Sequence, residues 1–202
     1  MKVAVLNFSG NVGKTTVAAH LLKPRMGDAP VYSIDVGASN VEDFLKLMQQ
    51  YDGSHEEFDV FIIPVVKEKK VQADTVNTIR ALQQLGIPKK KIRMVFNKLD
   101  TDESVIDEFA PLFGLAESEK SFTIRQDAVI YANEVFELLK TVGKSLGDIS
   151  TDTTDHRARI RDTTDLFERE ASIRMVSLKR LAVTANKNLD DVFKVLFGKL
   201  AL

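Results

Sequence analysis

The sequence predicts an α/β fold in which a mostly parallel sheet is covered by helices on both faces. Short apolar, β-branched runs recur along the chain, as in buried parallel strands. Segments with helical spacing separate these runs, so strands and helices alternate as in βαβ units. The chain has 202 residues, of which 44% are hydrophobic and 28% charged. That is enough for one well-cored globular domain.

The expected elements follow in order. The strands are short and apolar, and we place them at residues 2–7, 31–35, 58–66 and 92–96, with a short fifth at 122–124. The helices between them have good helix formers or an apolar stripe, and we place them at residues 15–22, 41–50, 71–85 and 128–146. Glycine or proline stands beside several of these segments, which is typical of helix termination.

The composition changes near residue 148. Residues 148–165 are polar and rich in Thr and Asp, which predicts a connection or an exposed helix. Residues 171–185 and 189–200 are expected to form two closing helices. We therefore expect a single domain over residues 1–202, with a core at 1–147 and a helical extension at 148–202.

Overall composition excludes several kinds of site. The net charge is −1, so no global basic field would hold nucleic acid. The chain has no cysteine, which excludes disulfides, thiolate metal sites and a thiol nucleophile. We find no signal peptide and no transmembrane span, so a cytoplasmic location is expected.

One motif indicates chemistry. Residues 9–16 read SGNVGKTT and lie between the first expected strand and the first expected helix. Small residues in such a loop let backbone N–H groups surround phosphate oxygens at a helix N-terminus. We expect Lys14 to reach the β- and γ-phosphates and Thr15 to place its hydroxyl on Mg²⁺. The expected nucleotide-binding residues are Gly10, Asn11, Val12, Gly13, Lys14, Thr15 and Thr16.

This motif predicts a P-loop NTPase, with the nucleotide bound by the core at residues 1–147. A plainer interpretation is a tight strand-to-helix turn with an incidental Gly-Lys-Thr. Asp35 ends the second expected strand, where an acid can hold Mg²⁺ through its waters. We expect catalytic roles for Lys14 and Asp35, and metal contacts from Thr15 and Asp35. An aspartate that only caps a turn is the alternative.

The loop departs from the common pattern, because Phe8 stands where the first glycine is usual. Residues 7–16 instead resemble the deviant Walker A loop of the ParA/MinD partition ATPases, whose core reads KGGVGKTT. The lysine that this family extends across its dimer falls at Ser9, and one family glycine falls at Asn11. The resemblance implies that Asp35 is the Walker B acid and that the switch I segment before it is missing or short.

The same resemblance implies a function and partners. We expect an Mg²⁺-dependent, ATP-binding switch or motor in plasmid stability or partition. Its expected partners are the nucleotide, a second copy of the chain, a plasmid DNA-binding protein and nucleoid DNA. The loss of the lysine at Ser9 implies slow hydrolysis by the chain alone. The alternatives are a P-loop kinase or ligase for a small acceptor, and a nucleotide-binding scaffold that does not hydrolyse.

Two further features leave alternatives open. Residues 97–100 read Asn-Lys-Leu-Asp, like the base-reading tetrad of GTPases, in which Asp100 would accept from guanine. We favour ATP, with Asn97 near the base, and keep GTP as the alternative. Residues 187–202 resemble the membrane-targeting helix of MinD, but Asp190 and Asp191 favour a packed last helix over membrane binding.

Overall fold

The computed structural model describes residues 1–26, 32–35, 40–51 and 53–198, with only the backbone for 32–35. The strands are β1 (Lys2–Val5), β2 (Tyr32–Asp35), β3 (Val60–Val65), β4 (Ile92–Leu99) and β5 (Val129–Tyr131). The α-helices are α1 (Lys14–Thr16), α2 (Val41–Gln50), α3 (Lys69–Gln84), α4 (Val105–Glu108), α5 (Ala110–Glu119), α6 (Val135–Val142), α7 (Leu146–Thr151), α8 (His156–Asp162) and α9 (Leu166–Phe197). Shorter helical turns are η1 (Val17–Leu22, π-type), η2 (Lys23–Arg25), η4 (Ser54–Glu57) and η5 (Lys89–Lys91).

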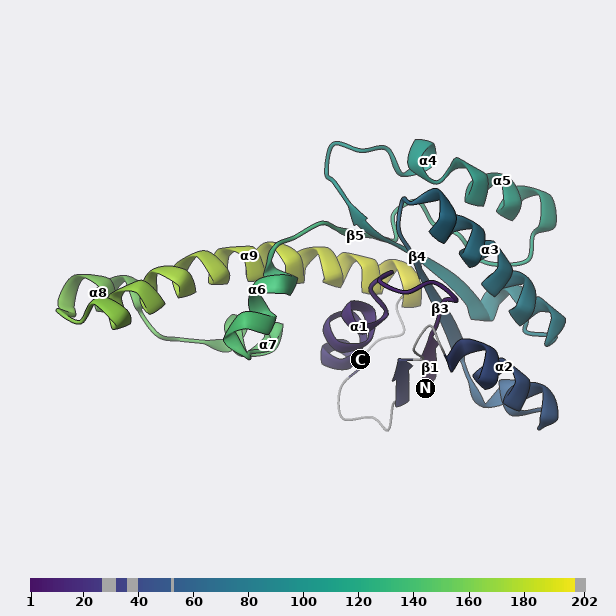
Figure 1. Ribbon diagram of the computed structural model, residues 1–202, viewed down its shortest axis with the longest axis horizontal. Helices are drawn as coiled ribbons and strands as arrows, with labels where there is room; N and C mark the ends of the chain where they lie inside the picture. The colour runs from purple at the N-terminus through teal and green to yellow at the C-terminus, as the bar shows by residue number, and fades with distance from the viewer. Residues whose placement is uncertain (27–31, 36–39, 52, 199–202) are drawn as a thin grey trace. The chain divides into compact units, whose positions relative to one another are not determined.

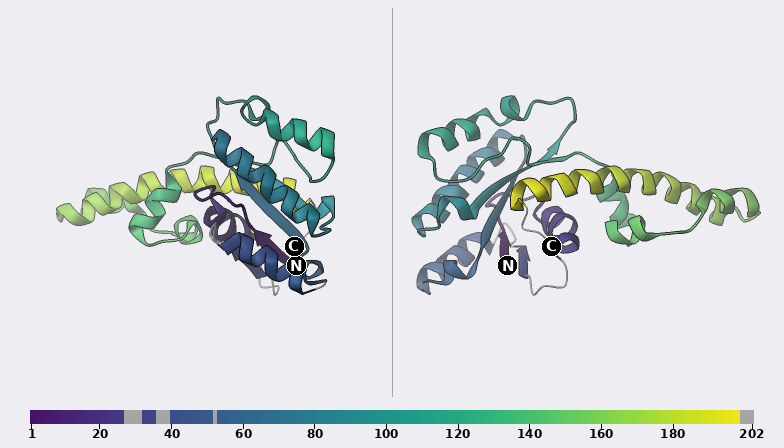
Figure 2. Two further views of the ribbon diagram at one scale, coloured as in Figure 1. Left: turned by 45° about the vertical axis from the view of Figure 1, so that its right-hand side comes forward. Right: turned by 180° about the vertical axis from the view of Figure 1, so that it is seen from behind.

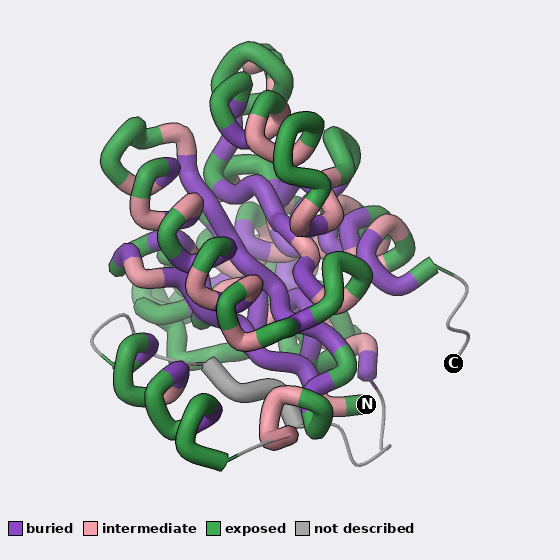
Figure 3. Tube along the Cα trace, turned by 90° about the vertical axis from the view of Figure 1, so that its right-hand side faces the viewer, coloured by how far each residue is buried: buried purple, intermediate pink, exposed green. Residues whose placement is uncertain are grey.

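The strands form one sheet in the order β2-β1-β3-β4-β5, and every neighbouring pair is parallel. All six residues of β3 are buried, as expected for an apolar strand covered on both faces (Figure 3). This confirms the predicted α/β fold with a parallel sheet.

The strand order determines where a ligand would enter. The chain leaves β1 for β2 on one side and then crosses to β3 on the other side. In open parallel sheets, ligands bind beyond the carboxyl ends of the strands at such a switch point. The loop after β1, residues 6–13, lies at this place in the topology.

Helices cover both faces of the sheet. In all views α2, α3 and α5 lie on one face, and α1 lies on the other (Figures 1 and 2). The apolar core of the first face joins strand residues to helix residues, among them Leu6, Phe61, Ile63, Leu45, Ile79 and Leu112. This core supports the strands that position the loop.

The chain divides into two units. The first comprises Met1–Ala132 and Asp190–Leu202, and the second comprises Asn133–Leu189. The second unit contains α6, α7, α8 and most of α9, and its interior is formed by buried apolar residues that include Val135, Leu139, Leu146, Ile149, Leu178 and Ala182. The boundary at residues 147 and 148 stays a prediction. Among the described residues, no helix has the length and hydropathy needed to cross a membrane.

The helix expected at 128–146 was wrong in its first part. Residues 129–131 form β5, which pairs with β4, and the helical residues within this range are 135–142 of α6 and residue 146, the first of α7. The β-branched Val129 and Ile130 suit a strand beside the buried β4. The strand expected at 122–124 was also wrong, since Thr123 makes only an isolated bridge to Arg93.

The two closing helices are in fact one helix, α9. The expected break contained Asn186 and Asn188, whose helix propensity is only modestly low. Buried positions continue across it at helical spacing, at Ala182, Ala185, Leu189, Val192 and Leu196. The apolar stripe therefore outweighs the local propensity. The helix expected at 15–22 is present, but η1 provides all of it after Thr16.

Candidate phosphate-binding site

The loop between β1 and α1 bends through two residues with left-handed backbone, Asn11 at φ 58° and Gly13 at φ 89°. A Cβ on Gly13 would lie 1.9 Å from Nδ2 of Asn97, so glycine is required there. A Cβ on Gly10 would meet nothing within 4 Å. The surface of the loop at Gly10 is therefore open to a ligand.

Lys14 lies at the start of α1 and is only 8% exposed. Its Nζ donates to the carbonyl oxygen of Ser9 at 2.8 Å and to that of Asn7 at 3.4 Å. Both acceptors are neutral, so an anion in the loop would be a stronger partner for this ammonium. Thr15 is exposed and Thr16 is half-buried, so the Thr15 hydroxyl is accessible at the first helical turn.

Strand β4 holds one side of the loop. The Asn97 amide donates to the Val12 carbonyl at 2.9 Å in a buried contact, and Lys98 Nζ donates to the Asn11 carbonyl at 3.3 Å. The structure thus brings Asn97 to the loop, while its contact with a base stays a prediction. Sequence reasoning missed Lys98, although it stands inside the tetrad that was singled out.

Helix α3 holds the other side of the loop. Asn7 Nδ2 donates to the Pro64 carbonyl at 2.9 Å and to Thr75 Oγ1 at 2.7 Å. The Phe8 N–H donates to Thr78 Oγ1 at 3.0 Å, and Ser9 Oγ donates to Asp74 Oδ2 at 2.6 Å. We call Asn7, Ser9, Asp74, Thr75 and Thr78 the loop cluster.

The apolar spacing of the α3 sequence does not reveal the loop cluster, because the α3 residues that contact the loop are polar. A second signal was present, since Gln72, Thr75 and Thr78 recur every three residues and are all buried. A polar stripe at this spacing beside an apolar one indicates a helix that contacts a polar segment.

Asp100 lies apart from these loop contacts, in an exposed cluster with Lys67 and Glu103. Lys67 Nζ lies 2.5 Å from Glu103 Oε1 and 3.5 Å from Asp100 Oδ2. The hydrogen bond with Glu103 raises the pKa of Lys67, and the same contact lowers the pKa of Glu103. The Asp100 carboxylate is thus already partnered by a cation.

Asp35 is described through its backbone. It is the last residue of β2 and is in register with Val5, the last residue of β1. Its side chain lies outside the described part of the structure, so its metal role stays a prediction. Among the described residues, no group of three or more His, Cys, Asp or Glu side chains could hold a metal ion.

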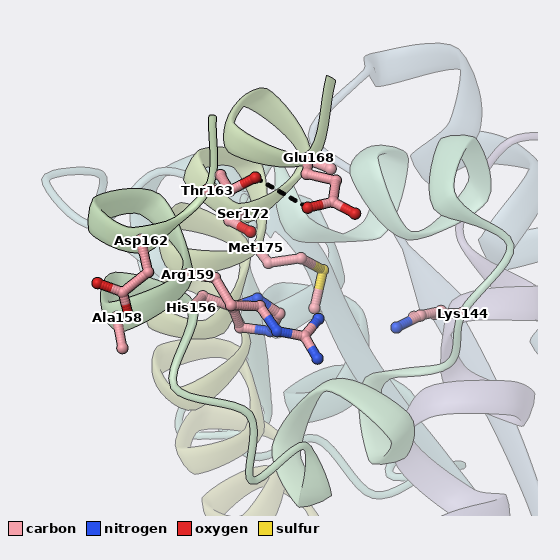
Figure 4. A pocket seen from close by; sticks show the side chains of 10 residues that line it. Lys144, His156, Ala158, Arg159, Asp162, Thr163, Glu168, Ser172 and Met175 are labelled. Carbon is pink, nitrogen blue, oxygen red and sulfur yellow. Dashed lines mark hydrogen bonds between the residues drawn. The ribbon is translucent and has the colours of Figure 1, made fainter. Parts of the chain in front are cut away.

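The second unit contains a separate hollow of about 710 Å³ (Figure 4). Lys144 and Arg159 line it together with Asp162 and Glu168, and Thr163 Oγ1 donates to Glu168 at 2.9 Å. The lining charges are thus of both signs. This hollow contains none of the residues predicted to bind nucleotide.

The chain was compared with known proteins by sequence and by structure. No protein-family model and no curated protein matches the sequence. Among solved structures, the chain is similar to the Cyanothece McdA(D38A)–ATP complex, with 13% identity and a TM-score of 0.44. The match covers 94% of this chain and 96% of that chain.

Proposed function

We propose that this chain binds ATP with Mg²⁺ through residues 9–16 and acts as a nucleotide switch or motor. The observation that supports this best is the buried Lys14 ammonium, which is held by carbonyl oxygens of the loop. Glycine at position 13 lets the same loop pack against Asn97. A tight turn without a ligand has no need for a buried cation, which is costly to desolvate.

Each loop residue has a defined task in this proposal. Lys14 would leave the carbonyls of Ser9 and Asn7 for the β- and γ-phosphates. The backbone N–H groups of residues 10–13 and of the first helical turn would donate to phosphate oxygens. Thr15 and Asp35 would hold Mg²⁺, which neutralises phosphate charge when bound.

ATP is favoured over GTP by the contacts of the tetrad. A guanine reader needs a carboxylate free to accept from the base, and Asp100 instead lies 3.5 Å from Lys67. A GTP-binding protein is the alternative, and it would require Asp100 to leave Lys67.

The cellular role rests on the resemblance of residues 7–16 to the ParA/MinD loop and on a narrower resemblance of the chain, strongest over residues 1–22, to the plasmid stability protein StbB. We propose a cytoplasmic role in plasmid stability or partition, with a nucleotide-dependent homodimer, a DNA-binding partner protein and nucleoid DNA. Hydrolysis by the chain alone would be slow, because Ser9 replaces the lysine that acts across the dimer. Burial of Val192, Leu196 and Phe197 supports packing of the last helix over membrane binding.

Calorimetry with ATP and with GTP, each with Mg²⁺ and with EDTA, tests the proposal. We expect ATP–Mg²⁺ to bind most tightly, and Asp35→Asn to weaken binding with Mg²⁺ more than binding without it. An equal loss in both conditions would exclude Asp35 from the metal site. A preference for GTP that disappears in Asp100→Ala would establish the guanine reader instead. Fast phosphorylation of a small acceptor would favour the kinase alternative.

A further inference from the structure

The side chain at position 9 is held within its own chain. Ser9 is 9% exposed, and its Oγ donates to Asp74 Oδ2 at 2.6 Å. Hydrogen bonds to a carboxylate are about twice as strong as bonds between neutral groups. Asp74 is the single acid in the sequence of α3 (Lys69–Gln84), so the contact joins the loop to this helix at a defined point.

The backbone of Ser9 makes contacts of a different kind. Its carbonyl oxygen accepts from Lys14 Nζ at 2.8 Å, and its N–H donates to Asn7 Oδ1 at 2.9 Å. When Lys14 turns to a phosphate, this carbonyl loses the ammonium and the peptide unit of Ser9 can shift. The side chain of Ser9 would pass that shift to Asp74.

A second contact runs beside the first. The Phe8 N–H donates to Thr78 Oγ1, and the same hydroxyl donates to the Asp74 carbonyl at 2.9 Å. Two consecutive loop residues are therefore tied to one turn of α3. A movement of the loop at residues 8 and 9 would therefore strain or break its hydrogen bonds to that turn.

We propose that Asp74 is a positioning residue for the phosphate-binding loop, and that the Ser9–Asp74 hydrogen bond transmits phosphate occupancy to helix α3. The proposal rests on ATP binding at the loop. In this proposal, nucleotide binding at the loop affects helix α3 of the same chain. A lysine at position 9 would instead contact the nucleotide of a partner chain.

Calorimetry with ATP–Mg²⁺ and hydrogen exchange of α3 test this. We expect Asp74→Ala to weaken ATP binding about tenfold or more, since it removes a charge-assisted hydrogen bond. Asp74→Asn keeps an acceptor oxygen and should stay within about threefold of the wild type. Asn77→Ala, an exposed change on α3, should have no effect. ATP should slow exchange in α3 of the wild type and not in Asp74→Ala.

The outcomes separate the two proposals. If the wild type does not bind ATP, both are wrong. If the wild type binds and Asp74→Ala matches it in affinity and in α3 exchange, only the role of Asp74 is wrong. Should Asp74→Ala fail to fold by circular dichroism, Ser9→Ala replaces it. Ser9→Ala removes the hydrogen-bond donor and should produce the same loss of ATP affinity. Adding Asp74→Asn to Ser9→Ala should cause no further loss of affinity.

Discussion

Two partly buried polar clusters in this chain are built from different chemical groups. The loop cluster joins amide and hydroxyl groups with one carboxylate, and its hydrogen bonds between the loop and α3 join residues 65 to 71 positions apart in sequence. The second cluster, in the second unit, consists of Asp152, His156 and Lys179. His156 Nε2 lies 2.6 Å and Lys179 Nζ 3.6 Å from the same Asp152 oxygen.

The two clusters stabilise the structure in different ways. The loop cluster and the Asn97 contact hold the shape of a backbone, so they should respond to changes of size and geometry. The second cluster holds α8 to α9 through charge, so it should respond to pH. The predictions below test this contrast, beginning with the largest expected effect.

Lys14→Ala should reduce ATP affinity by at least about a hundredfold, because it removes the cation that contacts the phosphates. The fold should survive, since Lys14 contacts loop carbonyls rather than the apolar core. Calorimetry measures the affinity and circular dichroism the fold. Lys98→Ala is the matched control, because this exposed lysine contacts the outside of the loop and should cost much less. Equal affinity in Lys14→Ala and wild type would exclude the loop as a phosphate site.

Gly13→Ala should destabilise the protein by about 1–3 kcal/mol, because alanine is strained at φ 89° and its Cβ meets Asn97. Gly10→Ala should change stability by less than about 0.5 kcal/mol, because the space around that position is open. Urea unfolding compares the two variants. Equal stability of both would mean that the loop does not close on β4 as described.

Asp152→Asn should destabilise the protein at pH 7, and this difference should shrink in acid. The hydrogen bond with His156 is the main cause that holds the pKa of Asp152 far below its ordinary 3.8. The folded state therefore binds this proton less readily than the unfolded state. The stabilisation is complete above the ordinary value and is lost as the pH falls below it. Urea unfolding of both proteins at pH 7, 5 and 3 checks this, and a difference that grows in acid would contradict it.

Features that depend on local sequence were predictable, whereas contacts between residues far apart in sequence were not. The first four strands and the loop were predictable because apolar strand patterns and the SGNVGKTT motif are local. The contact between Ser9 and Asp74 was not, because it depends on which helix lies beside the loop after the sheet forms. The contact between Asn97 and the Val12 carbonyl was not predictable for the same reason, since the two residues are 85 positions apart.

Errors in the later part of the chain had a local cause. The continuous α9 was expected as two helices, although the apolar spacing continues across residues 186–188. Strand β5 was assigned to a helix because three residues give too short a pattern to separate the two. Pairing with β4 decided its conformation, and such pairing leaves no trace in a single short segment.

The smallest expected effect concerns hydrolysis by Ser9→Lys. The unmodified chain should turn over ATP far below about 1–100 per second, the range of ordinary kinases. Introducing a lysine at position 9, where the ParA/MinD loop has one, should by itself change single-turnover hydrolysis by less than about threefold. Asp74 lies where the Ser9 side chain ends, so the introduced ammonium should pair with this carboxylate in its own chain.

Removing the Asp74 carboxylate should allow a lysine at position 9 to increase the rate of hydrolysis. Ser9→Lys/Asp74→Ala should hydrolyse ATP faster than Asp74→Ala alone when both are compared at saturating ATP, so that the weaker binding expected for Asp74→Ala does not enter. The gain should require a dimer and should therefore decline on dilution. A tenfold rise in Ser9→Lys alone would show that Asp74 does not hold position 9. No rise in the double variant would remove the argument that the missing lysine makes this chain slow, and would place the cause in the short interval between Lys14 and Asp35.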